Sequence, residues 1–264
     1  MNSLRKILKK NTVVFSAYII AKRTRRIFKP RKKIIETLHL TINFYKEFFS
    51  YQKHNTNKNF VINTHDMYPC IYDRTDTTKL DYTYFYQDSW CAKKIFENKP
   101  EHHYDIGSEA KMIGIISQFT PTTMLDIRPI DVKLPGLFFK KADVLKTGIA
   151  DNSIKSLSSI CVLEHIGLGR YGDKLDYFGT EKSVAEVKRI LAHNGNLYIS
   201  LPVDKENKIY FNAHRSFTRD YILSMFSSLQ LVEEKYIYRT RMFDTYDPSK
   251  GFGTGLFYFK KTKI

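Results

Sequence analysis

From residue 102 onward, the sequence alternates short apolar runs with segments of helical periodicity. The predicted strands are 103–106, 123–127, 138–144, 156–163, 196–201, 231–239 and 255–261, and the predicted helices are 109–119, 181–192 and 217–229. Strands that alternate with helices form a mostly parallel sheet covered by helices on both faces. Because the last two strands follow one another without a helix, we expect an antiparallel edge. The pattern predicts an α/β fold with a seven-stranded sheet that binds ligands at the carboxyl ends of its strands.

The positive charge of the chain is concentrated at its start. Of the 43 Lys and Arg residues in the 264-residue sequence, 12 lie in residues 1–35, which contain no acidic residue. The rest of the chain carries 31 basic and 27 acidic residues. An enzyme that acts on nucleic acid normally spreads positive charge along a groove of its folded body. This distribution therefore argues against a nucleic-acid substrate.

Residues 1–50 are predicted to form a basic helical extension, broken at Pro30. Three interpretations stay open for it. Residues 1–35 contact an anionic membrane surface, the segment is a solvated arm or packs on the body, or it binds RNA or another acidic partner. The apolar run Thr12–Ala21 is about half of the roughly 20 residues that a membrane-spanning helix needs. Basic residues follow this run where a signal peptide would have its cleavage site, so we expect no export.

Three cysteines without CxxC spacing predict neither a disulfide framework nor a zinc site, and we expect no metal. The expected location is cytoplasmic, with peripheral contact at the inner membrane face. Residues 51–101 are predicted to be a connecting or lid segment, and 102–264 the main domain. The aromatic cluster at 82–86 has two interpretations: it stacks on sugar rings, or it packs against the edge of the domain.

The first predicted strand ends in Asp105-Ile106-Gly107-Ser108, and Asp126 follows Gly107 by 19 positions at the end of the next strand. A glycine at such a turn lets the backbone approach a nucleoside, and an acid about 20 residues later can bind both ribose hydroxyls. The turn lacks the further glycines that a pyrophosphate site requires. The sequence therefore favours a nucleoside cofactor without phosphate.

The ordered segments DIGS, LDIR, KADV, CVLEHI and LAHNGNLYISLPV resemble those of the class I S-adenosylmethionine-dependent methyltransferases, over about residues 102–261. The resemblance implies a Rossmann-like fold with S-adenosylmethionine as cofactor. The implied cofactor ligands are Asp105, Gly107, Ser108, Asp126, Asp143, Val144 and Glu164. The strings LEHIGLGRYGDKLD and FNAHRSF are similar to an uncharacterised methyltransferase-like family that is common in bacterial surface-polysaccharide gene clusters and also present in nematodes.

Methyl transfer to a hydroxyl needs a nearby base, and a histidine suits neutral pH. The candidates for this catalytic base are His165 and His214, each of which can instead be a loop residue bonded to a backbone carbonyl. Residues 167–179 are read as an acceptor-binding loop or, alternatively, as a solvated turn. The candidate substrate ligands are Arg170, Tyr171, Asp173 and Arg215. For Arg215 a surface ion pair is the alternative.

The sequence thus predicts a methyltransferase that acts on a glycan precursor or a sugar-linked small molecule in surface-polysaccharide biosynthesis. The methyltransferase motif around Gly107 is reduced to one glycine. This departure leaves a second hypothesis open, a methyltransferase-like scaffold or binding protein without turnover at the membrane surface. A nucleic-acid methyltransferase is the third.

Overall fold

The computed structural model describes residues 31–262, and the chain divides into two compact units, Met1–Lys79 and Leu80–Ile264. In the first unit, helix α3 (Arg31–His54) is followed by an irregular segment that contains the short helix η1 (Thr64–Asp66). This segment folds back on α3, because Arg74 donates two hydrogen bonds to the Glu47 carboxylate at 3.0 and 3.1 Å. The predicted basic helix before Pro30 lies outside the described residues. In the described part of the chain, no helix is long and apolar enough to cross a membrane.

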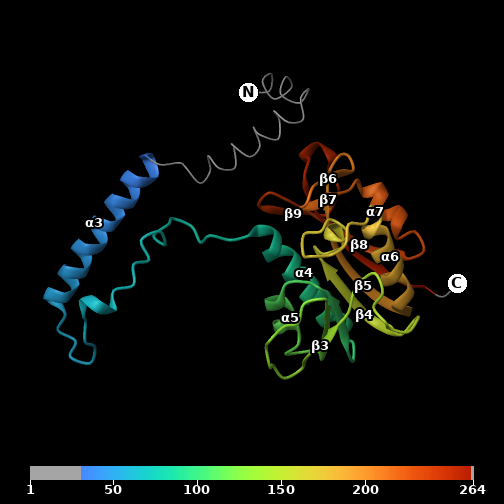
Figure 1. Cartoon of the computed structure of the whole chain (residues 1–264), viewed down its shortest axis with the longest axis horizontal. Coiled ribbons are helices and arrows are strands. Elements are labelled where there is room, and N and C mark those ends of the chain that lie inside the picture. The colour runs from blue at the N-terminus through green and yellow to red at the C-terminus, as the bar shows by residue number, and fades with distance from the viewer. Residues whose placement is uncertain (1–30, 263–264) are drawn as a thin grey trace, which may run out of the picture. The chain divides into compact units, whose positions relative to one another are not determined.

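The second unit carries the α/β fold (Figure 1). Its helices are α4 (Tyr82–Asn98), α5 (Ala110–Ile116), η2 (Leu163–His165), α6 (Gly179–Ile190), α7 (Arg219–Met225) and η3 (Pro248–Lys250). Its strands are β1 (His103–Ile106), β2 (Thr122–Asp126), β3 (Leu137–Lys141), β4 (Ile154–Ile160), β5 (Leu191–Val203), β6 (Lys208–Tyr210), β7 (His214–Ser216), β8 (Gln230–Tyr238), β9 (Arg241–Phe243) and β10 (Gly253–Lys260).

The main sheet has the strand order β3-β2-β1-β4-β5-β10-β8-β9. Strands β1 to β5 are parallel, and β10 pairs antiparallel with both β5 and β8, which confirms the predicted mostly parallel sheet with an antiparallel edge. The predicted count of seven strands is wrong, because β9 adds an eighth at the edge. It is three residues long and returns from β8 through Arg239 in the left-handed conformation, too short a run to show a strand period.

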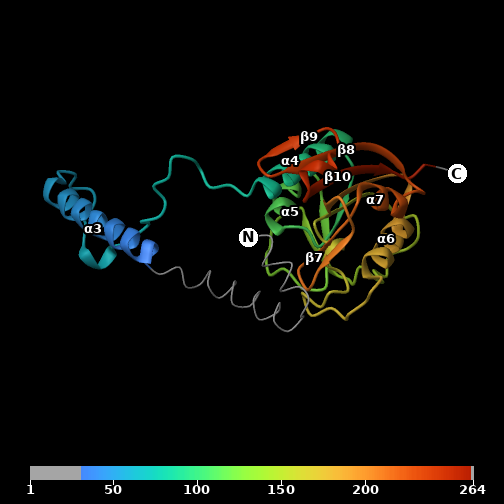
Figure 2. The same cartoon turned by 90° about the horizontal axis from the view of Figure 1, so that it is seen from above.

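Two apolar clusters cover the two faces of the sheet. Along β5, Leu197 and Ile199 face the cluster that includes α6 and α7, while Tyr198 between them faces the cluster that includes α4 and α5. All three side chains are fully buried. Figure 2 shows the sheet edge-on between these two helical layers. A strand buried on both faces reads as a continuous apolar run, which explains why this strand was predictable.

Helix α4 lies in the segment for which the sequence suggested a connection or lid. Asp81 caps it by accepting hydrogen bonds from the Thr83 and Tyr84 backbone N–H groups. Its buried residues are Gln87, Trp90, Cys91 and Ile95, which follow one helical face. The period is hidden in the sequence because the buried face includes a polar glutamine while several aromatic residues of the same helix are exposed.

The reversal of strand order falls between β1 and β4, since successive connections leave β1 toward β2 on one side and β4 toward β5 on the other. In an open sheet of this kind, ligands bind in the crevice at this switch point. The carboxyl ends of these strands therefore position the candidate site.

His103 at the start of β1 predicts a specific pH dependence of stability. Its ring is fully buried between the hydroxyls of Ser156 and Ser158, at 2.8 and 2.9 Å, and burial lowers its pKa to about 3. The unfolded chain takes up a proton on His103 near pH 6.5 and the folded chain does not. The contribution of the neutral, buried ring to the free energy of unfolding is therefore complete above pH 6.5 and is lost as the pH falls. We expect the stability advantage of the parent over His103→Gln to be about 2 kcal/mol smaller at pH 5 than at pH 7.5. Denaturant unfolding at both pH values measures it, and an advantage that does not change with pH would contradict the assignment.

Candidate functional site

The turn after β1 brings the backbone close to the end of β2. Gly107 has φ +62°, a conformation that favours glycine. A Cβ placed there would lie 3.2 Å from Val162 Cγ1 and 3.6 Å from Asp126 Oδ2. The Asp126 side chain accepts a hydrogen bond from the Arg128 backbone N–H at 2.8 Å through its other oxygen, Oδ1. Gly107 thus leaves space between the two strand ends and in front of one carboxylate oxygen.

Asp105 and Ser108 lie beneath this turn and do not line the space above it. Asp105 is fully buried and accepts hydrogen bonds from the Ser108 backbone N–H at 2.9 Å, the Ser108 hydroxyl at 2.6 Å and the Ser158 hydroxyl on β4. Ser108 in turn accepts from the Ile160 backbone N–H at 2.9 Å. Burial raises the pKa of Asp105 to about 6, against the effect of the Ser108 hydrogen bonds. The structure therefore gives both residues a supporting role, in contrast to the ligand role that the resemblance implied.

A cavity of about 430 Å³ opens at the carboxyl ends of β1 to β4. This volume lies in the usual range for small-molecule sites. Its lining includes the predicted residues Gly107, Asp126, Asp143, Val144, His165, Tyr171 and Asp173, together with Arg128, Cys161, Val162 and Lys174, which sequence reasoning did not single out. Four of the predicted cofactor ligands and two of the predicted acceptor ligands, Tyr171 and Asp173, thus line a single cavity.

The loop after β4 is held by the hairpin of β6 and β7. Arg215 on β7 is 6% exposed and donates hydrogen bonds to the Ile166 carbonyl at 2.6 Å, the Thr180 hydroxyl at 3.2 Å and the Asp176 carbonyl at 3.1 Å. The structure thus differs from the predicted substrate-binding or surface role of Arg215. Its guanidinium instead joins the strings LEHIGLGRYGDKLD and FNAHRSF inside the fold.

The same loop is closed on itself by Asp173. Its carboxylate accepts hydrogen bonds from the backbone N–H groups of Gly167 at 2.7 Å, Gly169 at 3.3 Å and Tyr171 at 3.2 Å. Asp173 lines the cavity, but these donors occupy its oxygens. Tyr171 is 40% exposed and presents its ring between two cations, with Arg128 Cζ at 4.6 Å and Arg170 Cζ at 5.0 Å from the ring centroid.

His165 is the predicted base that lines the cavity. Its Nδ1 lies 2.6 Å from the Ala213 carbonyl oxygen of the β6–β7 turn, so Nδ1 carries the proton and donates it. Nε2 then keeps its lone pair, which Arg170 Nη1 approaches to 3.5 Å and Glu164 Oε1 to 3.7 Å. Burial lowers the pKa of His165 to about 4, and the positive charge of Arg170 contributes. Arg170 also donates to the Ala213 carbonyl, at 3.1 Å, which places this exposed cation beside the imidazole.

His214, the other predicted base, lies on the hairpin outside the cavity lining. Its ring centroid is 6.4 Å from that of His165, and it packs against Tyr210 and Phe252 at 5.1 and 5.4 Å. Burial lowers its pKa, and Arg170 adds to this effect. The geometry favours His165 over His214 as the group that meets a ligand in the cavity.

A buried polar network adjoins the cavity through Cys161. Gln87 of α4 accepts hydrogen bonds from Cys161 Sγ and the Ser200 hydroxyl, both at 3.1 Å. Glu164 is 2% exposed, and burial raises its pKa to about 8, so it is mostly protonated at neutral pH. Gln87 Nε2 and Glu164 Oε2 are both buried without a hydrogen-bond partner. Buried polar atoms of this kind are expensive unless a ligand or water satisfies them. The sequence did not single out Gln87, because the helix α4 that carries it was not predicted.

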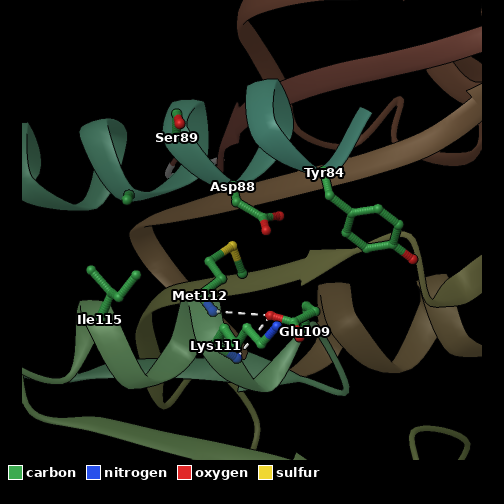
Figure 3. Close-up of a pocket in the computed structure, with 8 residues that line it drawn as sticks. Tyr84, Asp88, Ser89, Glu109, Lys111, Met112 and Ile115 are labelled. Atoms are coloured by element: carbon green, nitrogen blue, oxygen red, sulfur yellow. Dashed lines mark hydrogen bonds between the residues drawn. The ribbon is translucent and has the colours of Figure 1, made fainter. Parts of the chain in front are cut away.

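A second cavity, of about 540 Å³, lies between α4 and α5 (Figure 3). Tyr84 and Asp88 project into it from α4, and Glu109 from the start of α5. Glu109 caps α5 by accepting from the backbone N–H groups of Lys111 at 2.8 Å and Met112 at 3.3 Å. Its own carboxylate thus occupies the helix terminus that a phosphate would use. This agrees with the predicted preference for a cofactor without phosphate.

Comparison of the structure with solved proteins identifies the fold. The N-methyltransferase NodS from Bradyrhizobium japonicum WM9 matches 69% of this chain and 98% of its own at a TM-score of 0.51 and 11% identity. A putative sarcosine dimethylglycine methyltransferase from Galdieria sulphuraria matches 67% and 86% at 0.50 and 14%. The [4+2]-cyclase SpnF matches 67% and 80% at 0.52 and 12%. The second unit has the class I methyltransferase fold.

The sequence comparisons are narrower. A family model described as "Caenorhabditis protein of unknown function, DUF268" matches residues 147–242. This range contains both strings that Arg215 joins. No curated protein matches the sequence. In residues 31–262, no three His, Cys, Asp or Glu residues are grouped so that they can hold a metal ion.

The fixed tautomer of His165 can be tested directly. We expect ¹⁵N spectra of histidine-labelled protein to show a neutral His165 ring protonated at Nδ1 from pH 8 down to about pH 5, because burial holds its pKa near 4. His165→Gln identifies the signal. A ring that titrates near pH 6.5 would rule out the geometry described here.

Arg215 provides a second test. A lysine cannot reach all three acceptors, so Arg215→Lys leaves buried carbonyls without donors and is expected to lower the free energy of unfolding by about 2–4 kcal/mol. Hydrogen exchange of the backbone in 166–180 should become faster. The control is Lys182→Gln, which removes a half-exposed ion pair with Asp176 on the same loop and should cost less than about 1 kcal/mol. Equal effects of the two variants would contradict a loop-holding role for Arg215.

Proposed function

We propose that the protein is an S-adenosylmethionine-dependent methyltransferase. The observation that carries this proposal is the cavity at the strand switch point, where Gly107 leaves space in front of Asp126. The fold supports it, since NodS and the Galdieria protein are described as methyltransferases. The same cavity and carboxylate fit a nucleoside whose ribose presents two hydroxyls to one carboxylate.

The residues that line the cavity fit the nucleoside part of the cofactor. Asp126 would bind the ribose hydroxyls, and Asp143 with Val144 would flank the adenine. Gln87 Nε2 and Glu164 Oε2 are buried without a partner next to the cavity residue Cys161, outside the lining itself, and would supply a donor and an acceptor for the amino-acid end, which carries a carboxylate and an amino group. Satisfying these two buried atoms removes a cost that the protein otherwise bears.

When bound, S-adenosylmethionine supplies an electrophilic methyl group on a sulfonium. In the proposed mechanism, His165 Nε2 accepts the proton of an acceptor hydroxyl as the oxygen attacks. The Ala213 carbonyl keeps the Nδ1 proton in place, so the lone pair always lies on Nε2. Because burial lowers the pKa of His165 to about 4, the imidazole is neutral throughout the physiological range and its Nε2 is unprotonated.

The acceptor that we propose is a glycan precursor or a sugar-linked small molecule of surface-polysaccharide assembly. Tyr171 is 40% exposed at the cavity, and its hydroxyl can hydrogen-bond a sugar hydroxyl. Arg128, Arg170 and Lys174 add positive charge there, which suits an acceptor carrying phosphate or carboxylate groups. We further propose a cytoplasmic location, with residues 1–35 bringing the protein to the anionic inner face of a membrane.

A second candidate is a binding or scaffold protein that has kept the fold without methyl transfer. One observation favours it: the turn after β1 has a single glycine. SpnF, described as a [4+2]-cyclase, shows that the fold is also found in proteins named for other chemistry.

Cofactor binding separates these candidates from the start. We expect the full-length protein to bind S-adenosylhomocysteine in calorimetry and Asp126→Ala to bind it about 10- to 100-fold more weakly, because one charged group that accepts hydrogen bonds from the ribose is lost. Asp131→Ala is the matched control, since Asp131 is an exposed acid in the segment after β2 and does not line the cavity. Its affinity should equal that of the parent.

If neither S-adenosylmethionine nor S-adenosylhomocysteine binds the parent, the methyltransferase proposal fails and the scaffold candidate remains. If both bind, transfer of a labelled methyl group to nucleotide sugars and lipid-linked glycans tests the acceptor. Loss of transfer in His165→Ala with unchanged cofactor affinity would identify the base.

A further inference from the structure

Helix α3 has two apolar faces, and the chain itself covers one of them. A groove between α3 and the segment that folds back on it is lined by Leu40 and Phe44 from the helix and by Tyr68 and Ile71 from the segment. The Arg74–Glu47 ion pair and the hydrogen bond between Thr37 and Tyr72 hold the two parts together.

The other apolar face is exposed. It consists of Ile34 (61% exposed), Ile35 (69%), Leu38 (59%), Ile42 (45%), Tyr45 (45%) and Phe49 (54%), which we call the bare stripe. At about 100° per residue these six positions fall within an arc of roughly 100°. A contiguous exposed stripe of this kind marks a surface that meets another apolar phase.

The charges around the bare stripe indicate what it meets. With the same rotation of about 100° per residue, Lys46 and Lys53 lie along one edge of the stripe, whereas Glu36 and Glu47 lie on the opposite side of the helix. The chain that leads into α3, residues 1–30, contributes nine basic residues and no acid, and the first three residues of α3 are also basic. An apolar stripe bordered by lysines and continuous with a basic segment complements a surface that is apolar inside and negatively charged outside.

We propose that the bare stripe of α3 inserts into the interfacial layer of an anionic lipid bilayer, with the helix parallel to the membrane plane. From Ile34 to Phe49 the stripe is about 24 Å long at roughly 1.5 Å per residue, and the charged residues on the rest of the helix rule out a spanning orientation. Lysines at the edge reach the headgroups while their stems lie on the apolar layer. This inference deepens the proposed membrane location and does not depend on cofactor binding.

The test uses full-length protein and sedimentation with vesicles of phosphatidylcholine, either pure or with phosphatidylglycerol. We expect binding to the anionic vesicles, and 10- to 100-fold weaker binding for the double variant Leu38→Asn/Ile42→Asn, which removes two apolar side chains and keeps every charge. The matched control is His39→Asn/Ser50→Asn. It introduces the same residue twice on the polar arc of the same helix and should bind as the parent does. Circular dichroism compares the helix content of the two double variants.

A fluorescent probe gives a second measurement that does not weaken the stripe. The chain has one tryptophan, Trp90, which is buried in the second unit. Phe49→Trp should therefore report a shift of emission to shorter wavelength when anionic vesicles are added, relative to the parent. S-adenosylhomocysteine binding by Leu38→Asn/Ile42→Asn should equal that of the parent, which separates this proposal from the methyltransferase proposal.

Three outcomes would overturn the proposal. Absence of binding to anionic vesicles removes the partner. Equal binding by the parent and by Leu38→Asn/Ile42→Asn means that the charges alone are responsible. A parent that is an oligomer without vesicles, and a double variant that is a monomer, would assign the bare stripe to a contact between copies of the chain.

Discussion

The site depends on one buried carboxyl group. Asp105 joins the turn after β1 to β4 through Ser108 and Ser158, across the position where the strand order reverses. Because three donors bind this carboxyl from below, the turn is held from the protein side and its upper surface is left to Gly107. The space in front of Asp126 is a consequence of this support. A buried hydrogen-bonded network thus lies beneath the cavity and fixes the turn that borders it.

A second support comes from far along the chain. The hairpin of β6 and β7 supplies the Arg215 guanidinium to the loop after β4 and the Ala213 carbonyl to His165 and Arg170. The two strings that are long and distinctive in the sequence are therefore two halves of one structural unit. The 34 residues between them include α6 and β5, which carry the chain across the sheet and back. Such support lets a loop with several glycines present fixed side chains.

Much of the fold could be predicted because the central strands are buried on both faces and the helices between them are amphipathic. The site residues at the strand ends, such as Gly107 and Asp126, could also be predicted, because residues that follow parallel strands gather at one edge of the sheet. Helix α4 was missed because Gln87 interrupts its apolar face, and with it the polar network near Cys161 was missed. The prediction for Arg215 was a substrate ligand or a surface ion pair, because a guanidinium binds phosphate and carboxylate groups bidentately. Only the packing shows that its partners are backbone carbonyls, which no residue pattern records.

The shared use of the Ala213 carbonyl has a wider consequence. One oxygen atom fixes the proton of His165 and also anchors Arg170, so the imidazole and the cation move together with the hairpin. Displacement of the hairpin frees the Nδ1 proton, lets the ring exchange tautomers and releases the positive charge from beside it. Basicity at Nε2 is therefore a property of the closed hairpin and not of the histidine alone.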